Sequence, residues 1–245
     1  MKLDGNGEVP ESDTLDDSEL AQDIEEAVEP EAIAPAAVPS LTLQDALADF
    51  VGRKAQASNR MLAIQQLVAK TLFERGLHIG DFVLEQSVPG KHRTKKWDVV
   101  YSYRGRIHLA VSCKSIMANV AGTVPNRIDD AIGECANIHA YDPGIVLGYF
   151  FVMDKAGGMR INRDLNLPWY ESFGRSLASL SGRRSQHNSH DLFEAATLLL
   201  ADFSVRPFGV EFYPRTLSWD DFFDTLIDHV RDRNPTLRNR LDAPA

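Results

Sequence analysis

An aspartate, a serine and a lysine stand on either side of a short turn in the segment WDVVYSYRGRIHLAVSCKS, residues 97–115. The segment has the pattern of two strands joined at Arg104–Gly105, which predicts an antiparallel hairpin. Side chains at i and i+2 of a strand share a face, so Ser112 and Lys114 are expected to point the same way. In this register Asp98 comes opposite Lys114 at the open end of the hairpin.

Such a pair has two interpretations. An aspartate at this place can hold Mg²⁺, and a lysine beside it can orient or deprotonate a water and offset the charge of a phosphate. An ordinary cross-strand ion pair is the alternative. The hairpin alone leaves both open.

The elements around the hairpin predict an α/β fold. Apolar spacing, capping residues and turn signals predict the following elements: helices over 40–54, 58–76, 126–141, 189–203 and 218–233, and strands over 81–88, 97–103, 106–115, 144–153 and 208–213. Neighbouring strands are expected to pair as a meander, and later strands arrive through a helix. This order predicts a mixed central β-sheet flanked by helices on both faces.

The charge of the chain is concentrated at one end. Of its 245 residues, the first 40 hold twelve acidic residues and one lysine. Residues 41–245 carry a net charge of +2, from 25 Lys and Arg against 23 Asp and Glu. We expect residues 1–39 to be a disordered acidic tail, because they have little apolar surface to bury, and residues 40–245 to form one domain.

The two cysteines and the absence of long apolar runs indicate where the protein acts. Cys113 and Cys135 lie in no CxxC pair, so neither a disulfide framework nor a zinc site is expected. The N-terminus lacks the apolar core of a signal peptide, and no apolar run is long enough to span a bilayer. We expect a cytoplasmic protein without membrane contact.

The hairpin and the segment after it resemble the core of a known superfamily. Asp98 followed by a turn and a strand that ends in x-x-Lys114 resembles the PD-(D/E)xK nuclease motif. The downstream segment is similar to XhoI-type type II restriction endonucleases, in which a lysine strand end leads to an NR-x-x-(E/D)-AIG helix and then a GY-F/L strand. The matching residues are Lys114-Ser115, Asn126-Arg127, Asp130-Ala131-Ile132-Gly133 and Gly148-Tyr149-Phe150. The resemblance spans residues 97–154.

The resemblance implies a fold and an activity. The fold would have a restriction-endonuclease-like core, formed by residues 40–245. The activity would be that of a Mg²⁺-dependent endodeoxyribonuclease of the restriction-modification type, acting on double-stranded DNA, with Asp98 as a metal ligand and Lys114 as the residue that orients the attacking water. A homodimer is expected, because such enzymes commonly act as dimers on palindromic sites.

Ser112 departs from the motif, which has Glu or Asp two residues before the lysine. The first interpretation is that another carboxylate has taken the role: Glu85 on the first strand, or Asp130 and Glu134 on the following helix. We favour Glu134 and Asp130 as catalytic residues, with Glu134 as a metal ligand, because that helix follows the lysine strand closely. An ion pair with Arg127 is the simpler explanation of Asp130.

Two further interpretations of Ser112 remain. The metal can be held by Asp98, the backbone carbonyl of Cys113 and the substrate phosphate. Alternatively, the fold is a catalytically degenerate nuclease that serves as a DNA-binding or partner-binding module.

Basic and polar side chains near these motifs are the predicted DNA contacts. Segments 91–96 and 181–190 are basic loops of the kind that touch phosphates, although solvated loops often have this composition. The predicted DNA-binding residues are Lys91, Arg93, Lys95, Lys96, Asn126, Arg127, Arg183 and Arg184.

Overall fold

A mixed six-stranded sheet forms the centre of the computed structural model, which describes residues 40–54, 57–213 and 218–241. The strands are β1 (Phe82–Val88), β2 (Lys95–Tyr103), β3 (Arg106–Ile116), β4 (Val146–Asp154), β7 (Ala195–Asp202) and β8 (Gly209–Tyr213). They lie in the order β1-β2-β3-β4-β7-β8, and β5 (Ile161–Asn162) and β6 (Leu167–Pro168) form a separate small hairpin. The predicted meander is present, because β1, β2 and β3 pair antiparallel.

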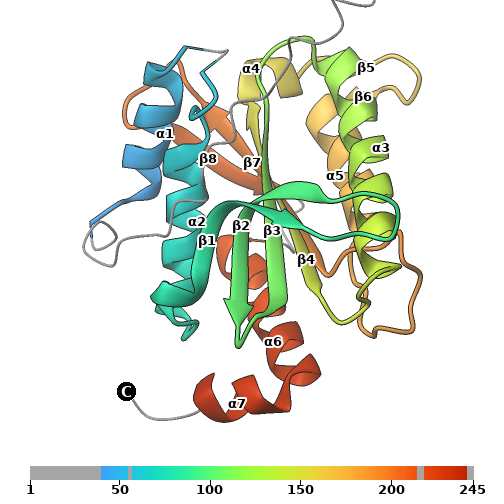
Figure 1. Ribbon diagram of the computed structural model, residues 1–245. Helices are drawn as coiled ribbons and strands as arrows, with labels where there is room; N and C mark the ends of the chain where they lie inside the picture. The colour runs from blue at the N-terminus through green and yellow to red at the C-terminus, as the bar shows by residue number, and fades with distance from the viewer. Residues whose placement is uncertain (1–39, 55–56, 214–217, 242–245) are drawn as a thin grey trace, which may run out of the picture.

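Helices cover both faces of the sheet (Figure 1). They are α1 (Leu43–Gly52), α2 (Leu62–Glu74), α3 (Val120–His139), α4 (Lys155–Gly158), α5 (Trp169–Leu180), α6 (Trp219–Arg233) and α7 (Pro235–Leu241), with the 3₁₀ helix η3 at Ile79–Asp81. One apolar core lies between the sheet and α1, α2 and α6, and a second lies between the sheet and α3 and α5. The predicted α/β class with a mixed, helix-flanked sheet is confirmed. No helix in the described ranges is long and apolar enough to cross a membrane.

The β2–β3 hairpin turns where the sequence predicts. Arg104 and Gly105 have φ values of 51° and 74°, the left-handed pair that a tight two-residue hairpin turn requires. At the other end of the hairpin, Val99 and Val111 are the last paired residues. Beyond them the two strands separate, and this fork contains the residues singled out from the sequence.

The predicted helix over 189–203 is wrong, because residues 195–202 form strand β7. β7 pairs parallel with β4 and antiparallel with β8, and its first seven residues are buried. A strand covered on both faces is apolar throughout, so periodicity does not separate it from a buried helix.

Helix α3 begins at Val120, six residues before the predicted start at Asn126. Pro125 therefore lies inside the helix, where a proline removes one backbone hydrogen bond. Val120 and Val124 are buried in the core beneath α3, and their packing compensates for that loss. Asn126 is consequently an exposed residue within the helix and caps nothing.

Two helix starts use the same capping chemistry. Ser218 and Asp221 form a capping box at the start of α6. At α1 the capping box is formed by Thr42 and Asp45, so the helix begins at Leu43 and not at Ser40, where it was predicted to begin.

Candidate functional site

Asp98 and Lys114 meet at the fork between β2 and β3. The Nζ of Lys114 lies 3.7 Å from Oδ2 of Asp98, and the two side chains are 25% and 13% exposed. The predicted proximity of these residues is therefore confirmed, but the predicted register is wrong: the pairing of Val99 with Val111 brings Asp98 level with Ser112, two residues before Lys114. Both groups are accessible from solvent while being largely shielded, which suits a site that binds a charged ligand.

Strand β3 holds the Asp98 carboxylate in place. The hydroxyl of Ser112 and the backbone N–H of Cys113 both donate to Oδ2 of Asp98, at 2.9 and 2.8 Å. Ser112 is 2% exposed, so its hydroxyl has been withdrawn from water to make this bond. The residue that replaces the acidic position of the motif thus supports the aspartate.

Cys113 contacts Asp98 through its amide. Its thiol packs in the core beneath α2, and burial raises the pKa of this thiol well above its usual value. The thiol is consequently inert at neutral pH. A metal contact from the Cys113 carbonyl stays a prediction.

Glu85 supplies a second carboxylate next to Asp98. In the β1–β2 ladder, Leu84 pairs with Val99 and Gln86 pairs with Trp97, which leaves Glu85 opposite Asp98 without a regular pairing. Glu85 has φ 53°, a left-handed conformation that costs a non-glycine residue roughly 1–2 kcal/mol. Local strain of this kind is concentrated at functional sites.

The side-chain amide of Gln65 joins the two carboxylates. Its Nε2 donates to Oδ1 of Asp98 at 3.0 Å and to Oε1 of Glu85. Gln65 lies on α2 and is 4% exposed. Side chains from α2, β1 and β2 therefore converge on the fork.

The surroundings of Glu85 disfavour its ionised form. Burial raises the pKa of Glu85, and the charge of Asp98 raises it further. The Gln65 hydrogen bond and the charges of Lys96 and Lys114 oppose this rise without cancelling it. A cation between the two carboxylates would relieve their repulsion.

The groups at the fork fit a hard divalent cation. Carboxylate and hydroxyl oxygens are the ligands that Mg²⁺ and Mn²⁺ prefer, and Mg²⁺ is commonly held by one or two carboxylates together with substrate phosphates. In the ranges that the structure describes, no cluster of three or more His, Cys, Asp and Glu residues is arranged to hold a metal. The candidate site thus rests on two carboxylates, Asp98 and Glu85.

Glu134 and Asp130, the carboxylates favoured from the sequence, do not reach the fork. Glu134 is 4% exposed, and it accepts a hydrogen bond from Tyr149 at 3.1 Å and pairs with Lys95 at 2.8 Å. Asp130 is exposed on α3 and pairs with Arg127 at 3.2 Å. Both predicted placements at the fork are wrong, because Glu134 is paired with Tyr149 and Lys95 and Asp130 is paired with Arg127.

Asn137 of α3 fastens the basic loop before β2. Its Oδ1 accepts from the backbone N–H groups of His92 and Arg93, at 2.9 and 3.3 Å, and its Nδ2 donates to the Arg93 carbonyl at 2.8 Å. The N–H of Lys91 donates to the Asn137 carbonyl at 2.9 Å. The side chains of Lys91 and Arg93 are left exposed, and so is that of Lys96 on β2.

The other predicted DNA contacts differ in their surroundings. Arg183 is fully buried and pairs with Glu194 at 3.0 Å, so a DNA contact from Arg183 is wrong. Lys95 is largely occupied by Glu134, and Arg127 by Asp130. Asn126 and Arg184 are exposed, and a role for either in DNA binding stays a prediction.

The loop of Arg184 lies at the other end of the parallel strands. Glu194, which follows this loop, accepts a hydrogen bond from the N–H of Leu147, and Leu147 is level with Ala110 of β3. Lys114 is four residues further along β3. The two basic loops named from the sequence therefore do not border the same site.

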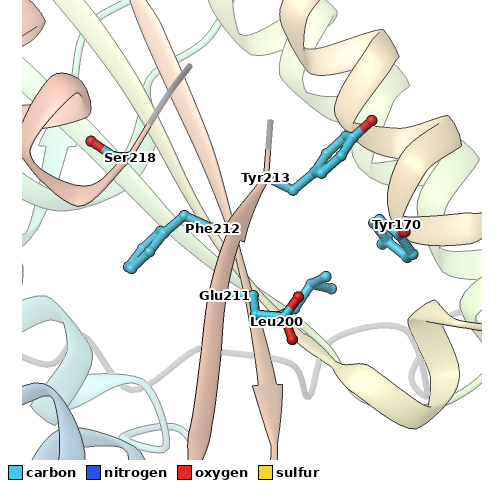
Figure 2. A pocket seen from close by; sticks show the side chains of 6 residues that line it. All are labelled: Tyr170, Leu200, Glu211, Phe212, Tyr213 and Ser218. Atoms are coloured by element: carbon cyan, nitrogen blue, oxygen red, sulfur yellow. The ribbon is translucent and has the colours of Figure 1, made fainter. Parts of the chain in front are cut away.

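A cavity of about 470 Å³ lies beside β8, and Figure 2 shows Tyr213 and Tyr170 on one side of the strand and Phe212 on the other. The carboxylate of Glu211 at this cavity is paired with Lys155. Tyr213 and Ser218 border residues 214–217, which lie outside the described part of the chain, so no ligand is assigned to the cavity.

The sequence indicated that Gln65 has a buried polar partner. This residue lies within the apolar stripe of α2, close to Ile64, Leu67 and Val68, and a polar side chain in such a stripe must find a buried partner. The partner is not readable from the sequence, because it depends on how α2 packs over β1 and β2.

Comparison of the chain with protein-family models, with curated proteins and with solved structures gives no match. The arrangement of Asp98, Glu85, Gln65, Ser112 and Lys114 is consequently the basis for assigning a function.

Proposed function

We propose that this protein is a divalent-metal-dependent nuclease that hydrolyses phosphodiester bonds in DNA, with Asp98 and Glu85 as metal ligands. The observation that supports the proposal is the meeting of these two carboxylates at the fork of the sheet, with Lys114 beside them. Two carboxylates and a lysine at the end of a strand pair are suited to phosphoryl transfer, because the carboxylates can hold a cation and the lysine can offset the charge of the phosphate.

Each side chain has a distinct role in this proposal. A divalent cation would polarise the scissile phosphate and offset its developing charge. Lys114 would orient the attacking water and stabilise the negative charge that develops on the oxygen of this water. Ser112 and the Cys113 amide would keep Asp98 in one orientation, which conserves the geometry that the reaction needs.

DNA is the proposed substrate because of the basic segment next to the fork. Lys91, Arg93 and Lys96 are exposed immediately before Asp98, and contacts from such side chains to phosphates supply affinity without sequence preference. The resemblance to XhoI-type restriction endonucleases further supports an endonuclease with a restriction-endonuclease-like core, acting as a homodimer on duplex DNA.

Cleavage of a supercoiled plasmid by the purified protein tests this function. We expect nicking or linearisation in Mg²⁺ or Mn²⁺ and none in EDTA. Asp98→Asn and Lys114→Met should each reduce the rate by about a hundredfold or more, because each removes a charge that acts on the transition state. Asp130→Asn is the matched control, because it removes a carboxylate that pairs with Arg127 away from the fork. Absence of cleavage in every metal would contradict the nuclease proposal.

The buried serine favours a second candidate function. With Ser112 in place of an acidic residue, the fork lacks the carboxylate that the motif has two residues before the lysine, which suits a catalytically degenerate module that binds DNA or a partner without cutting. This function predicts that the wild-type protein retards a DNA duplex but leaves plasmid intact, and that Ser112→Glu introduces Mg²⁺-dependent cleavage. Cleavage by the wild-type protein would exclude it.

A further inference from the structure

Gln65 is the link between the two carboxylates of the fork. Its amide nitrogen is within hydrogen-bond distance of both Asp98 and Glu85, while its side chain is 4% exposed. Burying a glutamine amide is costly unless its polar atoms have partners. The position of Gln65 is therefore specific to the carboxylates that it touches.

The two ends of an amide have opposite chemistry. The NH₂ group donates to anions, and the carbonyl oxygen is a ligand that hard divalent cations accept. The terminal torsion of glutamine is broad and roughly two-fold, so exchanging the two ends needs little movement of the rest of the side chain. A cation shared by Asp98 and Glu85 would repel the NH₂ group and attract the oxygen.

We propose that Gln65 is a third oxygen ligand of the divalent-cation site, and that its amide turns from donating to Asp98 and Glu85 to presenting Oε1 to the ion. This inference rests on the proposed metal site and extends it. It also accounts for how a site with two carboxylates reaches a useful affinity when Ser112 stands in the acidic position of the motif. Gln65 is on α2, so metal binding would draw α2, β1 and β2 together.

The test is calorimetric titration of the full chain with Mn²⁺. Gln65→Leu should weaken binding by about tenfold or more, the range expected when a metal-supporting group is removed. Gln65→Glu should bind Mn²⁺ at least as tightly as the wild-type protein, because it restores an oxygen ligand with a charge. Gln66→Leu is the matched control, since it removes the neighbouring amide on the same helix and should leave the affinity unchanged.

The outcomes distinguish a failure of this inference from a failure of the proposed metal site on which it rests. If the wild-type protein binds no Mn²⁺, the metal site itself is wrong. If the wild-type protein binds Mn²⁺ and Gln65→Leu binds equally or more tightly, Gln65 only competes with the ion, and the inference is overturned. Loss of affinity in Gln65→Leu together with its retention in Gln65→Glu would support the inference.

A second readout follows the Gln65 amide in the wild-type protein. In ¹H–¹⁵N spectra, the side-chain NH₂ signals of Gln65, assigned by their absence from Gln65→Leu, should shift when Mg²⁺ is added, because their hydrogen bonds to two carboxylates are broken. The signals of Gln66 should stay in place. Unchanged Gln65 signals at saturating Mg²⁺ would contradict the proposed rotation of the Gln65 amide.

Discussion

Ser112 stands where the nuclease motif has a carboxylate, and its hydroxyl donates to the carboxylate that remains. Oδ2 of Asp98 receives this bond and that of the Cys113 amide, while Oδ1 faces Gln65. Bonds from neutral donors stabilise an anion without neutralising it. At the scale of single residues, Ser112 does not supply the metal ligand of the motif but instead fixes the orientation of Asp98.

Ser112→Ala tests this supporting role. We expect a loss of about 1–3 kcal/mol in the free energy of unfolding, because a shielded carboxylate loses one of its donors. Ser115→Ala on the same strand is the control, since the Ser115 hydroxyl makes no side-chain hydrogen bond within the described part of the chain. Urea denaturation of both variants gives the comparison, and equal stability of the two would contradict the role.

The sequence was sufficient for part of the site. Asp98 and Lys114 were predicted to meet because a turn at Arg104–Gly105 brings the far ends of the two strands together. The exact register was not predictable, because the pairing shifts by one residue between Tyr101 and Ser102. Glu85 remained one of three open choices, since its approach to Asp98 depends on an irregular residue with positive φ in β1. Glu134 was favoured because its helix follows β3 in the chain, but chain proximity does not determine which side chains a carboxylate contacts, and Glu134 pairs with Lys95 and Tyr149.

At the scale of elements, the basic loop before β2 is ordered by α3. Asn137 makes three side-chain hydrogen bonds to the backbone of His92 and Arg93. Gly90 lies so close that an added Cβ would come within 1.9 Å of Nδ2 of Asn137. The loop and the helix are therefore fitted to each other, and the exposed cations of the loop have a fixed backbone.

Asn137→Ala should weaken binding to a short DNA duplex, because the loop would lose the anchor that orients its cations. Gly90→Ala should have the same effect by displacing the Asn137 side chain. Fluorescence anisotropy in Ca²⁺ measures the affinity, and we expect a fall of about tenfold for either variant, about 1.4 kcal/mol. Asp129→Ala, an exposed change on the same helix, is the control. Duplex binding at wild-type affinity by both loop variants would contradict this role.

The far end of α3 contains a buried ionic cluster. Glu194 pairs with Arg183 at 3.0 Å and with Arg233 at 2.7 Å, and Nε2 of His139 lies 3.8 Å from it. Burial lowers the pKa of His139 to about 4, and the charge of Arg183 adds to this effect against that of Glu194. The cluster joins α3, α6 and the segment before β7.

This cluster predicts acid sensitivity. An unfolded histidine has a pKa near 6.5, so between about pH 6.5 and 4 the unfolded chain takes up a proton that folded His139 does not. The stability from this residue is therefore present above pH 6.5 and lost as the pH falls, by roughly 3 kcal/mol at pH 4. His139→Gln should remove this part of the pH dependence. Denaturation midpoints at pH 7, 5.5 and 4.5 measure it, and parallel profiles for both proteins would contradict it.

Element types were predictable where periodicity was clear. The hairpin, β4 and α6 follow from alternation, a continuous apolar run and a capping box. β7 was mistaken for a helix because AATLLLAD is apolar on every face, and only its place between β4 and β8 decides its type. The early start of α3 was missed because the helix was predicted to begin at Asn126, whereas packing of Val120 and Val124 carries the helix through Pro125 from Val120 onwards.

At the scale of the whole molecule, the two basic segments named from the sequence lie at opposite ends of the parallel strands. At the fork, Gln65 of α2 contacts Asp98, and exposed cations of the adjoining loop and strand lie immediately before Asp98 in the chain. The segment 181–190 belongs to the other end of the parallel strands. We therefore expect phosphate contacts to come from Lys91, Arg93 and Lys96, with none from Arg183.

The salt dependence of DNA binding tests this arrangement. Replacing Lys91, Arg93 or Lys96 by alanine should reduce the slope of log K against log salt by about 0.9 for each phosphate that the variant no longer neutralises. Arg53→Ala, which removes a cation paired with Asp49 on α1, should leave the slope unchanged. Equal slopes for all four variants would show that DNA binds elsewhere.

The measurement that tests the central claim most directly is Mg²⁺-dependent plasmid cleavage by Glu85→Gln compared with Glu134→Gln, with both variants checked for thermal stability. Glu85 shares the Gln65 amide with Asp98, whereas Glu134 is paired with Lys95. The account predicts that Glu85→Gln loses about a hundredfold or more in rate and that Glu134→Gln, where folded, keeps cutting. Cleavage at the wild-type rate by Glu85→Gln would contradict the account.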